Sequence, residues 1–257
     1  MNPNLCRVVL RPRGPLEVFD LGMRLVSANA RPVLTLSAIL VLPTWIGCAA
    51  IAWVWPDLGW LAVTLAVTLG IPLQLPFALL GGRLLFSDDV AVRDVLRSWM
   101  GQMGPTFLVW FAYGCAIALG LLMCGWGALF TVVPTLYLAE TTMLERVPFQ
   151  RALRRSSRLA SAQPGTAGAG ALGWLVLTLW FAAVGEFGMQ GLLGMVLQLG
   201  SPFGSAMNGD ITPGLLLGLV AAQPAVAVYR LLLYVDVRTR VEGWDLQVRL
   251  RAAGLGS

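Results

Sequence analysis

The segment ETTMLERVPFQRALRRSSRLA, residues 140–160, separates two long apolar regions and carries the densest charge in the chain. On a helical wheel, residues 149–160 divide into an apolar side and a basic side formed by Arg151, Arg154, Arg155 and Arg158. Pro148 suits the first turn of this helix, because its missing N–H would have no partner there. An amphipathic helix with an arginine face is typical of a membrane surface. We therefore expect the rest of the chain to fold in a bilayer.

The composition predicts an all-α, polytopic membrane helical bundle, with residues 1–257 forming a single integral membrane domain. Hydrophobic residues make up 57% of the chain and charged residues 12%, against about 25% charged in a soluble domain. The chain contains no histidine, which excludes histidine-based catalysis and histidine metal sites. The cysteines form no CxxC pair, so we expect neither a metal nor a cofactor. Cys48 and Cys124 fall near the same predicted membrane face, either as packing residues or as a disulfide pair.

Six transmembrane helices are predicted, at about 33–54, 58–82, 105–123, 127–144, 167–186 and 212–234. The uncharged run 98–139 must cross twice, because a single helix of that length would measure about 63 Å against a bilayer core of about 30 Å. Its second crossing, 127–144, is expected to kink at Pro134. The apolar segment 188–200 is too short to span and is predicted to be re-entrant or interfacial.

Three further helices are predicted at the cytoplasmic surface. They are a pre-span helix at 15–31 and amphipathic helices at 88–100 and 148–160. Asp20 and Arg24 are four residues apart in the first of them and can form an ion pair. Ser87 is the expected N-cap of the second.

Charge is distributed unequally between the connections. All 18 basic residues are arginines in alternate connections, at 7–31, 83–97, 146–158 and 230–251. The opposite connections contain Asp57, Glu186 and Asp210 and no arginine. By the positive-inside rule, both termini lie in the cytoplasm and these three carboxylates lie outside the membrane, the last two in water.

Polar side chains inside the predicted spans have two interpretations each. Gln74 and Gln223 lie beside prolines, where they either repair the hydrogen bonding at a kink or line a functional cavity. Glu140, near the inner end of the fourth span, is either a structural ion-pair partner of Arg146 or Arg151, or an ion site.

The predicted cytoplasmic tail, 236–257, contains the pattern D-x-R-x-R-x-E-G-x-D-L, formed by Asp236, Arg238, Arg240, Glu242, Gly243, Asp245 and Leu246. Gly243 is expected to end a helix and Asp245 to cap the next. Two other segments accompany this pattern, R-P-x-x-x-x-E-x-x-D at 11–20 and A-L-R-R-S at 152–156.

With these motifs the chain resembles a family of mostly uncharacterised bacterial six-span proteins, which are similar to the membrane domain attached to some glycerophosphodiester phosphodiesterases. The resemblance implies a bacterial inner-membrane protein and supplies no activity. The phosphodiesterase chemistry of that group belongs to a separate soluble barrel that uses histidine and metal, and this chain lacks histidine.

The favoured functional hypothesis is a non-catalytic membrane protein that acts as a scaffold, a partner subunit or a lipid-interacting factor. Its expected partners are membrane lipids, with anionic headgroups at the arginine helix, or another membrane protein. The alternative interpretation of the arginine helix is that its charges only follow the positive-inside rule and form no selective lipid site. The alternative is a transporter or channel with a cavity at the proline-broken spans. A membrane-embedded lipid enzyme is the weakest hypothesis, because no nucleophile motif is present, and the small basic face, backed by membrane, argues against nucleic-acid binding.

Overall fold

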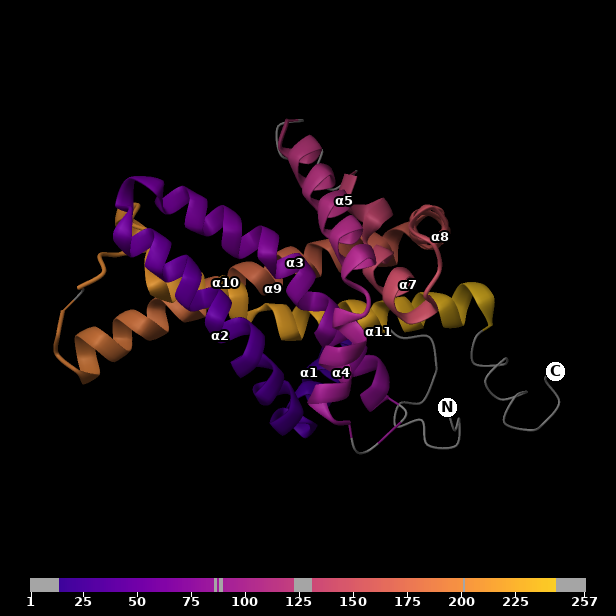
Figure 1. Ribbon diagram of the computed structural model, residues 1–257, viewed down its shortest axis with the longest axis horizontal. Helices are drawn as coiled ribbons and strands as arrows, with labels where there is room; N and C mark the ends of the chain where they lie inside the picture. The colour runs from indigo at the N-terminus through magenta and orange to yellow at the C-terminus, as the bar shows by residue number, and fades with distance from the viewer. Residues whose placement is uncertain (1–13, 86, 88–89, 123–130, 201, 244–257) are drawn as a thin grey trace.

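The computed structural model describes residues 14–85, 87, 90–122, 131–200 and 202–243 (Figure 1). This part of the chain is all-α and contains no β-strand. The α-helices are α1 (Pro15–Ala28), α2 (Ala30–Val54), α3 (Gly59–Leu84), α4 (Val92–Met100), α5 (Met103–Leu122), α7 (Leu138–Glu145), α8 (Phe149–Ala162), α9 (Pro164–Gln190), α10 (Pro213–Ala221) and α11 (Gln223–Glu242). Short 3-10 helices form η2 (Pro56–Leu58), η3 (Val133–Thr135) and η5 (Ala206–Asn208), and a π-helix forms η4 (Gly191–Val196).

Within the described residues, five helical stretches are long and apolar enough to cross a membrane: Ala30–Val54, Pro56–Leu84, Met103–Gly120, Pro164–Val196 and Pro213–Glu242. Their outer surfaces expose many large apolar side chains, among them Ile46, Phe111, Leu179 and Trp180. Soluble monomers rarely expose apolar surface on this scale. The five helices are therefore compatible with a membrane protein.

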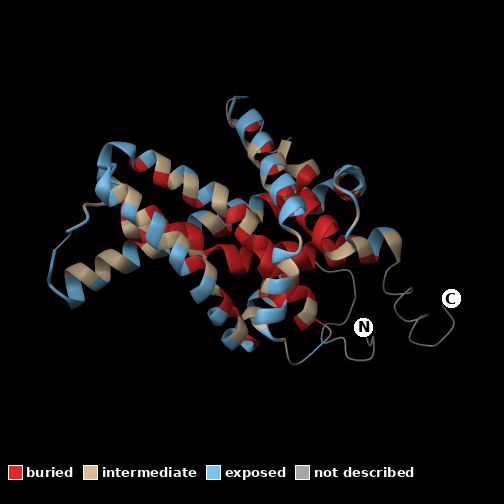
Figure 2. Ribbon diagram, viewed as in Figure 1, coloured by how far each residue is buried: buried red, intermediate tan, exposed pale blue. Residues whose placement is uncertain are grey.

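Helix α11 forms the centre of the bundle. It runs along the long axis of the molecule, with the α2–α3 hairpin and α9–α10 toward one end and α5, α7 and α8 toward the other (Figure 1). Buried residues concentrate on α11 and on the second half of α3 (Figure 2). In the most apolar part of Pro213–Glu242, 83% of the residues are buried, against 17% for α2. The outer helices thus keep apolar faces for lipid, whereas the central helix is covered by protein.

Glycines allow α9 and α10 to pack backbone to backbone. A Cβ atom added at Gly185 would lie 2.5 Å from the carbonyl oxygen of Gly214 and 2.8 Å from the Cα of Gly218. Only residues without a side chain permit this approach, as in other small-residue interfaces between membrane helices. Helix α10 ends at Ala221 and α11 begins at Gln223, because Pro224 suits the first turn of a new helix and cannot donate to the preceding one.

The fourth predicted span, 127–144, is described only in part, because 123–130 lie outside the described residues. The remainder is not one continuous helix. The 3-10 helix η3 interrupts it at Pro134, the residue where a kink is predicted, and α7 follows from Leu138 to Glu145.

Several element boundaries differ from those expected. Helix α9 continues through Gln190 into η4, which ends at Val196, so most of the segment 188–200 is continuous with α9. Helix α4 begins at Val92 rather than at 88, with Ala91 at its N-cap, while the hydroxyl of Ser87 donates to the carbonyl of Arg83.

The predicted tail is also partly helical, because α11 continues to Glu242. Ion pairs one turn apart support this extension: Arg240 Nε lies 2.9 Å from Asp236, and Arg238 Nε lies 2.9 Å from Glu242. Gly243 ends the helix with φ 59°, as predicted, and Asp245 lies outside the described residues. The predicted pair of Asp20 and Arg24 is present in α1 at 3.0 Å.

Candidate functional site

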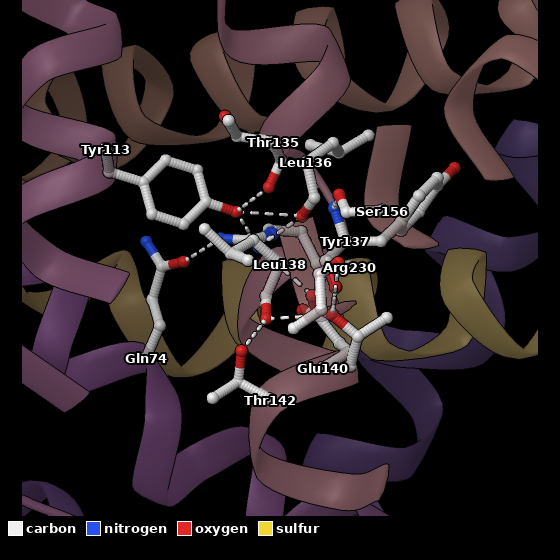
Figure 3. Close-up of polar contacts among 12 residues, drawn as sticks. Gln74, Tyr113, Thr135, Leu136, Tyr137, Leu138, Glu140, Thr142, Ser156 and Arg230 are labelled. Carbon is white, nitrogen blue, oxygen red and sulfur yellow. Dashed lines mark hydrogen bonds and ion pairs between the residues drawn. The ribbon is translucent and has the colours of Figure 1, made fainter. Parts of the chain in front are cut away.

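A cluster of buried polar side chains surrounds Arg230 in the middle of α11 (Figure 3). Arg230 is 1% exposed and donates to acceptors on three other segments. Its Nη1 lies 2.7 Å from Gln74 Oε1 on α3, and its Nη2 lies 2.5 Å from the Tyr113 hydroxyl on α5. Nη2 also donates to the carbonyl of Leu136 and lies 3.2 Å from Glu140 Oε2 on α7. One guanidinium group therefore joins helices from four parts of the chain.

Glu140 supplies the charge that balances Arg230. It is also 1% exposed, and the two groups form a fully buried ion pair. The guanidinium carbon lies 5.2 Å from the ring centre of Tyr113 and 5.1 Å from that of Trp174 on α9, within the range of cation–π attraction. The predicted partners Arg146 and Arg151 do not pair with Glu140 in the described structure. Glu140 therefore forms an ion pair, but with Arg230 rather than with either of the expected partners.

The break at Pro134 creates acceptors for this cluster. A proline cannot donate a backbone hydrogen bond, and the turn that follows it leaves carbonyl groups available to side chains. The Tyr113 hydroxyl lies 2.6 Å from the carbonyl of Thr135 and 2.9 Å from that of Leu136. The hydroxyl of Ser156 on α8 donates to the carbonyl of Pro134 at 2.8 Å. The proline break therefore docks α5, α8 and α11 onto the fourth segment.

Gln74 and Gln223 belong to the same network and bond to each other. Gln74 Nε2 donates to Gln223 Oε1 at 2.6 Å, and Gln223 Nε2 donates to the carbonyl of Leu219 at 2.8 Å. Both side chains are 3% exposed, and Gly70 on α3 leaves the space that Gln223 fills. Pro224 leaves the carbonyl of Val220 without its helical donor, and Gln223 bonds the carbonyl of Leu219, one residue earlier. The two glutamines therefore bond to each other and to the backbone beside the proline break.

Sequence reasoning did not find Arg230 as a site residue and assigned it to a cytoplasmic connection. The structure corrects this assignment, because α11 continues for three more turns beyond it. A signal was present: Arg230 lies inside an apolar run, PAVAVYRLLLYV, at 224–235. A charge flanked on both sides by apolar residues in a span usually faces the bundle interior and has a partner there.

A second feature is a groove beside α8 with a volume of about 410 Å³. The four arginines predicted to form the basic face, Arg151, Arg154, Arg155 and Arg158, line it together with Glu145 from α7 and Glu242 from α11. Apolar lining comes from Val147, Leu159 and Val241. The groove thus combines an arginine wall with an apolar floor.

Arg155 is fixed in this groove by two carboxylates. It lies 2.6 Å from Glu145 and 2.8 Å from Glu242, and Arg238 contacts the same two residues at 3.4 Å and 2.9 Å. Burial alone would lower the pKa of Arg155, but the two carboxylates outweigh it and raise the pKa above its ordinary value. Tyr234 also donates to Glu145. The network joins α7, α8 and α11, and it gives the tail-motif residues a structural role.

The other three arginines of α8 are available to a ligand. Arg151, Arg154 and Arg158 are exposed and form no ion pair within the part of the chain that is described. The side of α8 that faces the rest of the protein buries Ala152, Ser156, Leu159 and Ala160.

At the other end of the bundle, Glu186 differs from its prediction. It is 4% exposed rather than in water, and it accepts hydrogen bonds from the Thr212 hydroxyl, from Gln190 and from the backbone N–H of Ala206 at 2.9 Å. Gln190 lies on α9, whereas Ala206 and Thr212 belong to the segment that returns to α10, so the carboxylate ties that segment to α9. Asp210 is exposed, as predicted.

Two further findings bear on chemistry. Cys48 is a buried free thiol, and Cys124 lies outside the described residues. No group of three or more Cys, Asp or Glu side chains in the described ranges is arranged to hold a metal ion. In comparisons with known proteins, no family model, curated protein or solved structure matches the chain.

Proposed function

We propose that this chain is a non-catalytic integral membrane protein that binds anionic lipid headgroups through the groove beside α8. The proposed topology has six spans, with both termini and the amphipathic helices α4 and α8 on the cytoplasmic side of a bacterial inner membrane. The confinement of arginine to alternate connections supports this topology. Arg230 and Glu140 lie in the bundle interior and carry opposite charges, so leaving both out of the cytoplasmic count does not change the charge difference between the two sides.

The observation that carries the lipid proposal is the arginine wall of the groove. Three exposed guanidinium groups, which have no carboxylate partner among the described residues, lie beside the apolar side chains that line the groove. Each arginine near a membrane surface contributes about 1 kcal/mol of attraction to anionic lipid. Helix α8 is seen nearly end-on where α11 runs across the view, so it crosses the long helices steeply, as a helix in the membrane plane would (Figure 1).

The polar cluster around Arg230 supports a structural rather than a transport role. Its members bond to one another in the protein interior, and the two glutamines proposed as cavity residues bond directly. A transport path would instead present polar groups to water. A lipid-interacting or scaffolding protein needs only a rigid bundle to hold its cytoplasmic surface in place.

The proposal is tested by lipid-dependent thermal stability of the full chain in mild detergent. Phosphatidylglycerol at about 100 times its Kd should stabilise the protein by about 2.7 kcal/mol, a Tm rise of about 5 to 10 °C, and phosphatidylcholine should have little effect. The variant Arg151→Gln/Arg154→Gln/Arg158→Gln should lose most of this rise.

The matched control replaces three exposed arginines elsewhere on the proposed cytoplasmic side, Arg31→Gln/Arg93→Gln/Arg97→Gln, and should keep it. Equal shifts in both triple variants would contradict the assignment of the site to α8.

A further inference from the structure

The charges that line the groove beside α8 do not cancel. Glu145 and Glu242 are both engaged by Arg155 and Arg238, so two carboxylates meet two guanidinium groups. The remaining arginines of the wall, Arg151, Arg154 and Arg158, have no carboxylate partner in the described residues. The groove therefore presents an excess of three positive charges, more than one phosphodiester can neutralise.

The spacing of these three residues also exceeds the reach of a single phosphate. Arg151 and Arg158 are seven residues apart on α8, which corresponds to about 10 Å along the helix axis, and Arg154 lies between them. An arginine recognises phosphate oxygens through paired N–H donors in a fixed plane. Two phosphate groups, one between Arg151 and Arg154 and one between Arg154 and Arg158, would satisfy all three side chains.

The apolar lining indicates that this ligand is amphiphilic. Val147, Leu159 and Val241 line the groove beside the arginines, and Val241 is 39% exposed. A soluble polyphosphate would leave this apolar surface in water, whereas the glycerol and upper acyl chain of a lipid would cover it.

We infer that the groove selects phospholipids that carry two phosphate groups over phospholipids with a single negative charge. This inference rests on the proposed function above and names the lipid class that the same site takes. Because the second phosphate engages at least one further arginine, binding should be at least about fivefold tighter per lipid molecule, which corresponds to about 1 kcal/mol.

The inference is tested by native mass spectrometry of the full chain, released from micelles that contain cardiolipin, phosphatidylglycerol at twice its molar amount to match total charge, and phosphatidylcholine. The wild type should retain cardiolipin at least about fivefold over phosphatidylglycerol. The variant Arg151→Gln/Arg154→Gln/Arg158→Gln should lose this preference, and the control Arg31→Gln/Arg93→Gln/Arg97→Gln should keep it. Replacement of the three α8 residues by lysine should reduce the preference without abolishing it, because lysine keeps the charge but not the paired donors.

Each other outcome has a separate meaning. Equal retention of cardiolipin and phosphatidylglycerol per negative charge, abolished by the α8 variant, would overturn the inference and leave the proposed function standing. Retention of neither above phosphatidylcholine would overturn both. Displacement of bound cardiolipin by millimolar pyrophosphate would show that the site takes soluble phosphates, and would overturn its assignment to lipid.

Discussion

Arg230 and Glu140 provide the sharpest test of the structure, because each is buried and each depends on the other. Arg230→Met removes the donor that serves Glu140 and Gln74, and so leaves a carboxylate and an amide oxygen without a partner in the bundle interior. Breaking one side of a buried ion pair costs about 3 to 5 kcal/mol. Glu140→Met leaves the Arg230 charge uncompensated and should cost a similar amount.

The double variant Arg230→Met/Glu140→Met removes both charges and leaves only neutral acceptors such as Gln74 Oε1 unpaired. An unsatisfied neutral group costs about 1 to 3 kcal/mol, so the double variant should be no less stable than either single one. Additive effects would instead sum to about 6 to 10 kcal/mol. The coupling energy between the two sites should therefore be at least about 3 kcal/mol.

The measurement is the free energy of unfolding of each variant in mixed micelles titrated with sodium dodecyl sulfate and followed by far-ultraviolet circular dichroism. Arg24→Met is the control, because it breaks an exposed pair with Asp20 and should cost less than about 1 kcal/mol. Single variants that lose less than about 1 kcal/mol, or a double variant equal to the sum of the singles, would refute the buried pair.

Two further perturbations probe other contacts. Gly218→Ala places a Cβ against the backbone of α9 and should destabilise the bundle by about 1 to 3 kcal/mol in the same titration. The control is Gly188→Ala, whose added Cβ meets open space and should be neutral or slightly stabilising. Equal effects of the two substitutions would show that α9 and α10 do not pack at Gly218. Glu186→Ala removes the acceptor of three donors and should accelerate proteolysis of the loop before α10 by about tenfold or more. The comparison is Asp57→Ala, an exposed carboxylate in another connection, which should leave the cleavage rate unchanged. An unaltered rate for Glu186→Ala would mean that the carboxylate does not hold the loop.

The parts of the fold that could be predicted from the sequence are those that depend on local pattern. The apolar runs locate α2, α3 and α11, Pro134 marks a break, and Gly243 marks a helix end. These features follow from hydrophobic length and backbone chemistry, which neighbouring residues determine. The glycines between 188 and 194 suggested a helix end where α9 in fact continues into η4, because a glycine permits a helix end without requiring one.

The candidate site was predicted only where it lies on one helix. Periodicity identified the arginine face of α8, but not its counter-charge from Glu242, which is 87 residues away from Arg155. The pair of Arg230 and Glu140 is separated by 90 residues, and a count of charges at span ends treats both as cytoplasmic. Partners brought together only by tertiary packing leave no mark in local sequence spacing.

The position of Arg230 along the chain also bears on how the protein is made. Gln74, Tyr113 and Glu140 leave the ribosome earlier and enter the bilayer before the guanidinium that satisfies them. During that interval Glu140 lacks the guanidinium that pairs with it, and a carboxylate without a partner inside a bilayer costs about 3 kcal/mol. Insertion of α11 is then the step that ends the interval, so a nascent chain stalled before Arg230 would be a natural substrate for membrane proteases.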